Sequence, residues 1–183
     1  MANEILEFQP VYEAFRPKIN RYLARLVGEP EAEDLTQEVF IKVSNALKTF
    51  RGESQLSTWI YRIATNTAID KIRSTAYRQG AEQSLSDDIN ETEDKDAWTG
   101  EETPSLEQQL MRKEMVDCFE EYVANLPVSY RTVFVLSDLE ELTNQEIAEI
   151  LGLSLDVVKI RLHRGRSKLL RELRTHCKEE DWL

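Results

Sequence analysis

The sequence has few of the residues that mark secreted or membrane proteins. Its 183 residues include two cysteines, Cys118 and Cys177, which are too few for a disulfide framework and are expected to be buried thiols. No stretch approaches the roughly 18 apolar residues of a membrane span, and the acidic N-terminus lacks the apolar core of a secretory signal. We therefore expect a cytoplasmic protein with no direct membrane insertion.

Metal ligands are also scarce. His176 and Cys177 are adjacent and would supply half of a metal site, but the chain has no second pair of this kind. Zinc is usually held by about four protein ligands. We therefore expect no metal site and no cofactor.

The negative charge of the chain is concentrated in one segment. The formal net charge is −11, and residues 80–105 hold nine acids against one base. This segment has few apolar residues and no helical or strand period, so it cannot bury enough surface to order itself. We expect a flexible acidic linker there. Residues 1–79 and 106–183 on either side are each long enough for a small domain.

The two flanking halves show helical periodicity and no alternating strand pattern. In the first half, apolar spacing predicts a helix that ends at Gly28, a second helix over residues 31–47 and a third over residues 57–78. In the second half, helices are predicted over residues 106–126 and 128–139. The expected fold class is all-α, with two small helical domains joined by the linker.

The end of the second half predicts a helix-turn-helix. Thr143 and Glu146 form a T-x-x-E capping box that begins one helix, Gly152 ends it, and Ser154 caps the next helix. A turn of about three residues containing glycine joins two helices at the angle of a helix-turn-helix. Three apolar residues are expected to face inward from the second helix: Val158, Leu162 and Leu169.

This second helix is basic although the chain is acidic. From Lys159 to Arg174 there are seven bases and one acid. Five residues turn outward and would meet base edges in a major groove: Lys159, Ile160, His163, Arg164 and Ser167. Flanking bases are expected to contact phosphates: Arg161, Arg166, Lys168 and Arg171. The alternative is a solvated basic face that complements the helix dipole.

Two further helix faces in the first half combine polar and apolar side chains. The second helix gathers an acidic and apolar set that suits protein docking, and a merely solvated face is the alternative: Asp34, Gln37, Glu38 and Ile41. The third helix gathers a set that suits unstacked bases and their phosphates: Trp59, Arg62, Asn66, Asp70 and Arg73. The alternative for Trp59 is an ordinary place in the core of its own domain.

These segments together resemble the sigma-70 family, and within it the extracytoplasmic-function group. The first half is similar to the family's region 2 through RYLARLVG (21–28), EAEDLTQEVFIKV (31–43) and FRGESQLSTWIYRIATNTAIDKIR (50–73). The second half is similar to region 4 through LPVSYRTVFVL (126–136) and the helix-turn-helix. The motifs occur in the family's order, and the resemblance covers nearly everything outside the linker.

The resemblance implies a transcription initiation factor that catalyses no reaction itself. Its implied partners are the beta-prime and beta subunits of core RNA polymerase, promoter DNA as duplex and as melted strand, and an anti-sigma factor. The acidic face of the second helix, hereafter the docking face, matches the residues that bind the beta-prime coiled coil. The third helix and the loop before it, hereafter the minus-ten face, match the element that reads and melts the minus-ten DNA; its loop residues are Phe50, Arg51 and Ser54.

For the second half, the resemblance implies that Lys159, Ile160, His163 and Arg164 read the minus-thirty-five element. Arg131 belongs to an LPxxYR segment, whose role is either structural or directed at a phosphate.

The basic helix departs from the family pattern. Residues 155–160 stand where members commonly carry Gly-Thr-Val-Lys-Ser, and Ile160 replaces a hydroxyl donor with an apolar side chain that suits a thymine methyl group. Gly165 replaces an alanine, which costs the helix about 1 kcal/mol. The family's minus-thirty-five sequence is therefore not transferred to this chain.

Two other functions are consistent with parts of the pattern. A stand-alone helix-turn-helix regulator would bind duplex DNA without polymerase, and the minus-ten face counts against it. A helical adaptor would bind proteins only, and the basic helix counts against that.

Overall fold

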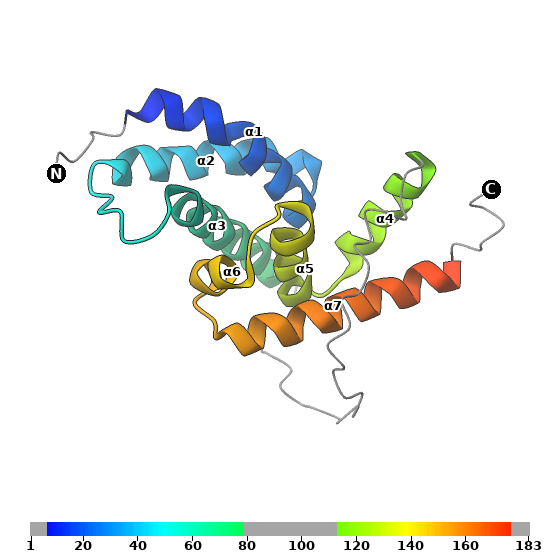
Figure 1. Cartoon of the computed structure of the whole chain (residues 1–183). Coiled ribbons are helices and arrows are strands. Elements are labelled where there is room, and N and C mark those ends of the chain that lie inside the picture. Colours follow the sequence, from blue (N-terminus) through cyan, green and yellow to red (C-terminus); the bar gives the residue numbers. More distant parts are fainter. Residues whose placement is uncertain (1–6, 79–112, 177–183) are drawn as a thin grey trace.

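The computed structural model describes residues 7–78 and 113–176 (Figure 1). Every regular element within these two ranges is a helix, which confirms the all-α prediction. The linker expected over residues 80–105, the start of the helix expected from residue 106, and Cys177 lie outside the described residues. The domain boundaries drawn at that linker remain predictions.

The first half is a bundle of α1 (Phe8–Val27), α2 (Glu29–Leu47) and α3 (Leu56–Arg78). Ile19, Val39 and Ile60, one from each helix, are fully buried between them. Gly28 has a φ of 92°, which lets the chain reverse between α1 and α2. α2 begins two residues before the predicted start, because Pro30 lies in its first turn, where a missing N–H costs nothing.

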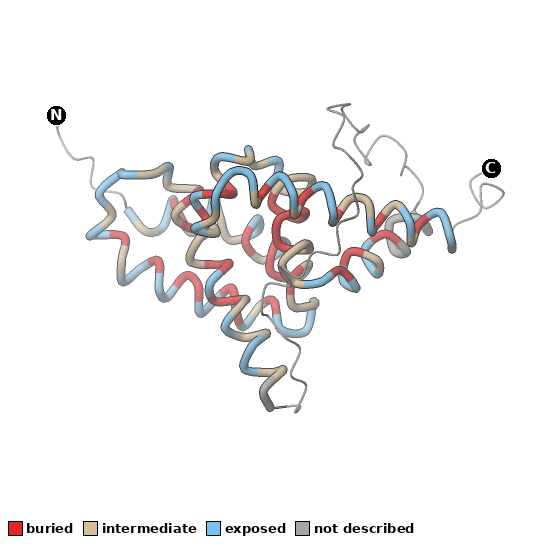
Figure 2. Tube along the Cα trace, turned by 90° about the horizontal axis from the view of Figure 1, so that it is seen from below, coloured by how far each residue is buried: buried red, intermediate tan, exposed pale blue. Residues whose placement is uncertain are grey.

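The second half consists of α4 (Lys113–Asn125), α5 (Val128–Phe134), η2 (Val135–Leu139), α6 (Asn144–Leu151) and α7 (Leu155–His176). α7 is the long helix onto which α4, α5 and α6 pack (Figure 1). Its three predicted inward residues, Val158, Leu162 and Leu169, are buried as expected. Figure 2 shows the same arrangement throughout, with buried residues along helix sides that meet and exposed residues outside.

The segment η2 is a π-helical turn where the sequence predicted the end of an ordinary helix. The Glu140 N–H donates to the Val135 carbonyl oxygen at 3.0 Å, five residues back. The next residue, Glu141, has a φ of 56°, which non-glycine residues rarely adopt. The turn therefore ends in a locally unfavourable conformation that its surroundings must stabilise.

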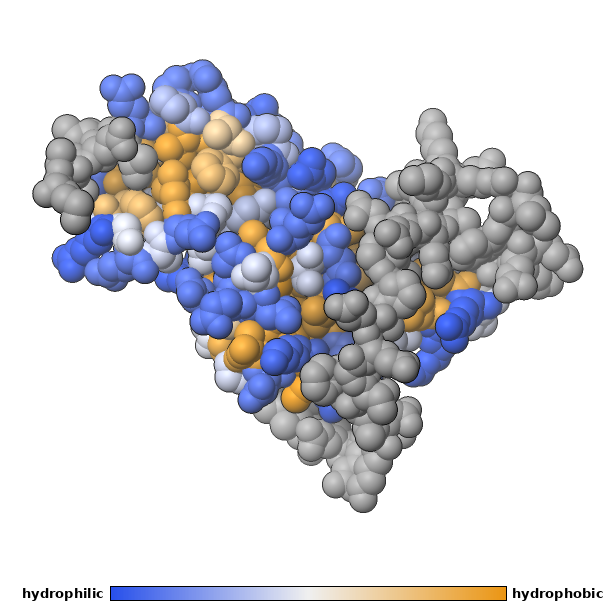
Figure 3. All heavy atoms as spheres, in the orientation of Figure 1, coloured by the Kyte–Doolittle hydropathy of each residue, from blue (hydrophilic) through white to orange (hydrophobic). Residues whose placement is uncertain are grey.

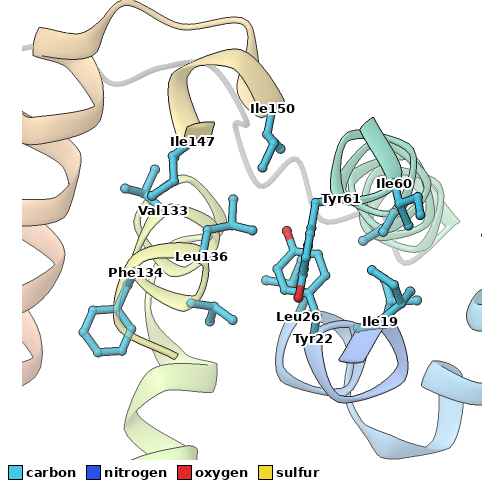
Figure 4. Packing of buried hydrophobic residues seen from close by; sticks show 14 of the residues in the cluster. Ile19, Tyr22, Leu26, Ile60, Tyr61, Val133, Phe134, Leu136, Ile147 and Ile150 are labelled. Carbon is cyan, nitrogen blue, oxygen red and sulfur yellow. The ribbon is translucent and has the colours of Figure 1, made fainter. Parts of the chain in front are cut away.

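The two halves pack against each other. α3 lies against α6, and α1 lies against α4, α5 and η2. In Figure 4, Tyr61 of α3 and Tyr22 of α1 face Leu136 and Ile150 of the second half. All four side chains belong to one continuous cluster of buried apolar residues. The described residues thus form a single packed unit rather than two separate bodies.

Most of the visible surface is hydrophilic, with hydrophobic residues gathered mainly at the α1 and α2 end (Figure 3). Within the described ranges no helix combines the length and the apolar character needed to cross a membrane.

Candidate nucleic-acid interface

The helix-turn-helix has the caps that the sequence predicts. The Thr143 hydroxyl accepts from the Glu146 N–H at 3.3 Å, and the Thr143 N–H donates to the Glu146 carboxylate at 2.8 Å, which completes the capping box. Gly152 is left-handed, with a φ of 65°. The Ser154 hydroxyl accepts from the Val157 N–H at 3.3 Å. These local contacts fix where α6 begins and ends and where α7 begins.

The outward side of α7 carries the residues expected to read base edges. Lys159, His163 and Arg164 are exposed, and Ser167 is half-buried. Ile160 is 49% exposed, so its aliphatic side chain is open to solvent beside these polar groups. The face therefore combines hydrogen-bond donors, which suit base edges in a major groove, with one apolar side chain, which suits a thymine methyl group.

The bases expected to contact phosphates divide into two groups. Lys168 and Arg171 are exposed, and Arg161 is half-buried. Arg166 instead binds Asp138 of η2 through two nitrogens, with Nη2 donating to Oδ1 at 2.8 Å and Nε to Oδ2 at 3.3 Å. This ion pair holds α7 against η2, so Arg166 would have to leave Asp138 to bind a phosphate.

Arg131 has the structural role that the sequence left open. Its Nη1 donates to the Leu26 carbonyl oxygen of α1 at 3.0 Å. Burial lowers the pKa of its guanidinium below the usual value. Its Nε is buried and has no hydrogen-bond partner among the described residues. Arg131 therefore lies inside the contact between the two halves, where a phosphate has little access.

Gly165 of α7 is buried and faces α5. A Cβ atom placed there would lie 3.4 Å from the Cβ of Tyr130 in α5. This is an ordinary contact distance, so an alanine would fit at this position and the packing does not offset the cost of the glycine to the helix.

The minus-ten face lies along α3 and the loop before it. Asn66, Asp70 and Arg73 are exposed along the helix, and so is Arg51 in the loop. Ser54 in the loop and Arg62 on the helix are half-buried, and the Arg62 Nε is buried without a hydrogen-bond partner in the described part of the chain. The face thus offers amide, acidic and basic groups beside one another.

Trp59 lies between its two predicted positions. Its ring packs against Phe50 with centroids 5.0 Å apart, and it also contacts the core cluster. Both aromatic residues remain half-buried rather than buried. The pair therefore forms an aromatic step at the start of α3, held by the core on one side and open on the other.

The docking face is fully on the solvent side of α2. Asp34, Gln37, Glu38 and Ile41 are all exposed, and Ile41 is 63% exposed. Glu38 binds Lys42 one turn later at 2.7 Å. An exposed apolar residue beside acidic ones is typical of a surface that another protein covers.

One buried acidic residue was not indicated by any sequence pattern. The Glu140 side chain, just after η2, is 2% exposed and lies between the two halves. Its carboxylate accepts from the Tyr61 hydroxyl at 2.6 Å and from Arg25 Nη1 at 3.2 Å, and Arg21 Nη2 is 3.6 Å away. Its partners are 79 to 119 residues away in the sequence, so no local spacing could have indicated them.

Comparison with known proteins gives the family. The family model for sigma-70 region 2 matches residues 11–78, and the model for sigma-70 region 4 matches residues 117–169. The ECF RNA polymerase sigma factor SigW of Bacillus subtilis is 34% identical over 170 residues, which cover 91% of this chain and 89% of that protein. The chain belongs to the sigma-70 family. It is an extracytoplasmic-function sigma factor, a transcription initiation factor with region 2 and region 4 domains, as the sequence resemblance predicted.

Further relatives agree with this assignment. The ECF RNA polymerase sigma-E factor of Escherichia coli K12 is 31% identical over 158 residues, with 85% of this chain and 80% of that protein covered. The fold matches the sigma factor RpoE in its complex with the anti-sigma factor NepR from Bartonella quintana, at a TM-score of 0.68, 19% identity, and coverage of 92% and 98%. It also matches CnrH in complex with the cytosolic domain of CnrY, at a TM-score of 0.63 and 20% identity, with coverage of 92% and 88%.

Proposed function

We propose that this sigma factor binds core RNA polymerase, directs it to particular promoters and helps to open the minus-ten DNA. The observation that carries the proposal is the exposure of three separate faces, on α2, α3 and α7, in a chain that matches both sigma regions. The protein acts in the cytoplasm and catalyses no reaction itself, because the polymerase makes the RNA.

The docking face on α2 binds the coiled coil of the beta-prime subunit. Ile41 supplies the apolar contact, and Asp34 and Glu38 select a basic partner surface. Glu38 exchanges its ion pair with Lys42 for one with the polymerase. The region 4 half completes assembly through the beta subunit.

The minus-ten face holds the melted strand. The aromatic step of Phe50 and Trp59 supports an unstacked base, and Asn66 contacts base edges. Arg51 and Arg73 contact the phosphates beside them. Opening is favoured because the separated strand gains contacts that the duplex cannot make.

The outward face of α7 reads the minus-thirty-five duplex. Arg164 donates two parallel hydrogen bonds to a guanine, Ile160 contacts a thymine methyl group, and Lys168 with Arg171 binds phosphates. The docking of both regions on one polymerase makes the two DNA contacts intramolecular, which raises their joint affinity.

An anti-sigma factor is the proposed regulator. The family resemblance implies one, and one matched structure is a sigma factor held by an anti-sigma factor. Capture of partners from cell extract with the full chain should recover core polymerase and one small protein. Recovery of polymerase alone would contradict this regulator.

The docking face gives the sharpest test of the proposed function. Asp34→Lys combined with Glu38→Lys should abolish co-purification with core polymerase, because both charges change sign on an exposed face. Helix content and melting temperature should stay unchanged. The matched control is Glu7→Lys with Glu13→Lys, two exposed acids elsewhere, which should assemble normally. Normal assembly of the docking-face variant would contradict the assignment.

A further inference from the structure

Regions 2 and 4 are joined by a polar cluster that none of the three proposed binding faces uses. The carboxylate of Glu140 comes from the end of η2 in region 4, and its donors Arg21, Arg25 and Tyr61 all come from region 2. Figure 4 shows the apolar part of the same contact, with Tyr61 facing Leu136 and Ile150. The closed arrangement therefore depends on both polar and apolar contacts.

The Glu140 carboxylate is well compensated in this position. A carboxylate taken out of water is tolerated only when charged or strong donors surround it. Here two guanidinium groups and a phenol hydroxyl do so, and the hydroxyl contact is short at 2.6 Å. Separation of the regions would break all three contacts together, and the loss of any one donor would leave buried charge less well balanced.

A second hydrogen bond ties the same two regions. Arg131 of α5 donates to the Leu26 carbonyl oxygen near the end of α1, at 3.0 Å. This oxygen belongs to the last turn of a helix, where carbonyl groups lack a partner within the helix. Arg131 therefore caps a region 2 helix from region 4, close to the Glu140 contacts made by Arg25 on the same helix.

The backbone beside Glu140 is not regular α-helix. It directly follows a π-helical turn, and Glu141 beside it has a φ of 56°. Turns of this kind are uncommon and recur at functional positions, where surrounding contacts hold them. Asp138 in the same turn binds Arg166 on α7, so one strained turn holds α7 on one side and region 2 on the other.

The closed arrangement is too short for the proposed promoter contacts. By their names, the minus-ten and minus-thirty-five elements lie about 25 base pairs apart, which is about 85 Å of duplex at about 3.4 Å per base pair. α3 has 23 residues and α7 has 22, so each is about 35 Å long at about 1.5 Å per residue. Since α6 packs on both helices, their reading faces cannot reach both elements at once.

We propose that Glu140, held by Tyr61 and Arg25, is a latch that keeps regions 2 and 4 closed in the free sigma factor and that releases when the factor assembles with polymerase. The need for release rests on the proposed function, but the latch itself is a property of the free chain. Closure lowers the apparent affinity for polymerase, which equals the affinity of the open form multiplied by the fraction of molecules that are open.

The test measures the distance between the regions directly. Spin labels are placed at Ser44 on α2 and Gln145 on α6, two exposed positions, with Cys118 and Cys177 replaced by serine. Pulsed electron paramagnetic resonance on the full chain should give one narrow distribution of distances between the two labels. Glu140→Ala should raise the open, long-distance population by about tenfold or more. Glu141→Ala removes the same charge from the exposed neighbour and should leave the distribution unchanged.

Two further variants keep the result interpretable if Glu140→Ala folds poorly. Tyr61→Phe keeps the ring and removes only the hydroxyl, and it should raise the open population by a smaller factor. Glu140→Arg combined with Arg25→Glu restores one pair of opposite charges and should close the regions again relative to Glu140→Arg alone. A broad distribution in the unsubstituted protein, or no change in both Glu140→Ala and Tyr61→Phe, would overturn the latch.

Polymerase binding separates the latch from the proposed function. Unlabelled Glu140→Ala should bind core polymerase about tenfold more tightly than the unsubstituted chain, because less of the binding energy is used to open it. A shifted distance distribution with no polymerase binding by either protein would leave the latch standing and remove the proposed function. Equal affinity of the two proteins, with the distances shifted, would overturn the role of the latch in assembly.

Discussion

The helices α3 and α7 both present a proposed DNA face, yet their remaining surfaces differ. α3 buries Ile60, Ala64 and Ala68 in its own bundle and turns Tyr61 toward region 4. α7 buries one apolar side, and the rest of it is basic, with seven bases and two acids against four bases and one acid on α3. The surface of α3 thus contacts its own bundle and region 4 and presents the minus-ten face. The exposed side of α7 presents only the proposed face for duplex DNA.

This difference indicates two kinds of recognition. Duplex DNA is bound largely through its phosphates, so its affinity falls steeply with salt. Melted strands are held mainly by base stacking on aromatic rings, which adds affinity without a matching charge. The basic side of α7 suits the first mode, and the aromatic step and amides of α3 suit the second.

Among substitutions on α7, the loss of Arg164 should have the largest effect on promoter binding. Arg164→Ala should cost about 1–3 kcal/mol on the preferred minus-thirty-five element and relax discrimination at one base pair, because a bidentate contact to guanine disappears. Holoenzyme binding to single-base promoter variants measures both. Arg164→Lys keeps the charge without the planar fork, so it should recover affinity but little specificity. Equal weakening on every variant would make Arg164 a phosphate contact.

The matching change on α3 is Trp59→Ala. It should weaken holoenzyme binding to a promoter with an unpaired minus-ten region by about 1–3 kcal/mol, the usual worth of one stacked base. Binding to a minus-thirty-five duplex fragment should not change, and Trp59→Phe should retain most of the affinity because it keeps a ring that can stack on a base. A lower melting temperature with unchanged affinity would show that Trp59 serves only the core.

The buried tyrosines beside the contact between α3 and region 4 should make the free energy of unfolding fall at alkaline pH. Burial, and then the hydrogen bond to Glu140, raises the pKa of Tyr61 well above its usual value; burial does the same for Tyr22. A raised pKa means that the folded state keeps its proton, so the stability is present below about pH 10 and is lost as pH rises above that value. Each tyrosine should reduce the unfolding free energy by about 1.4 kcal/mol at about pH 11.

Urea unfolding of the full chain at several alkaline pH values measures this loss. Tyr61→Phe removes one titrating group and should lower the pH slope by about half. An identical slope in that variant would show that Tyr61 ionises freely in the folded protein and that the contact with region 4 is open.

Local signals in the sequence predicted local structure. The capping box of Thr143, the left-handed Gly152 and the Ser154 cap each depend on residues within four positions, and all three are present. Helical periodicity likewise predicted the docking face, which is exposed. The π turn and the Glu140 contacts were not predictable in this way, because they depend on how region 2 packs against region 4.

Charge alone also failed to separate two kinds of arginine. The positions of Arg166 and Arg131 in basic or family motifs predict phosphate contacts, but each has a partner inside the protein. An arginine that binds a half-buried carboxylate and one that faces solvent look alike in one sequence. Only the tertiary position of Asp138 and of the end of α1 distinguishes them.

The smallest effect expected is on Arg171 of α7, which is exposed further along the helix than Arg164. A phosphate contact there adds affinity without sequence information, because every base pair carries the same phosphates. Arg171→Ala should therefore weaken all promoter variants alike and lower the salt slope by about one unit. That change reduces the loss of affinity between about 50 and 200 mM salt by about fourfold. Holoenzyme binding is measured on the variant set used for Arg164, at several salt concentrations. A loss confined to one base position, with the slope unchanged, would place Arg171 in the groove and extend the base-reading face of α7.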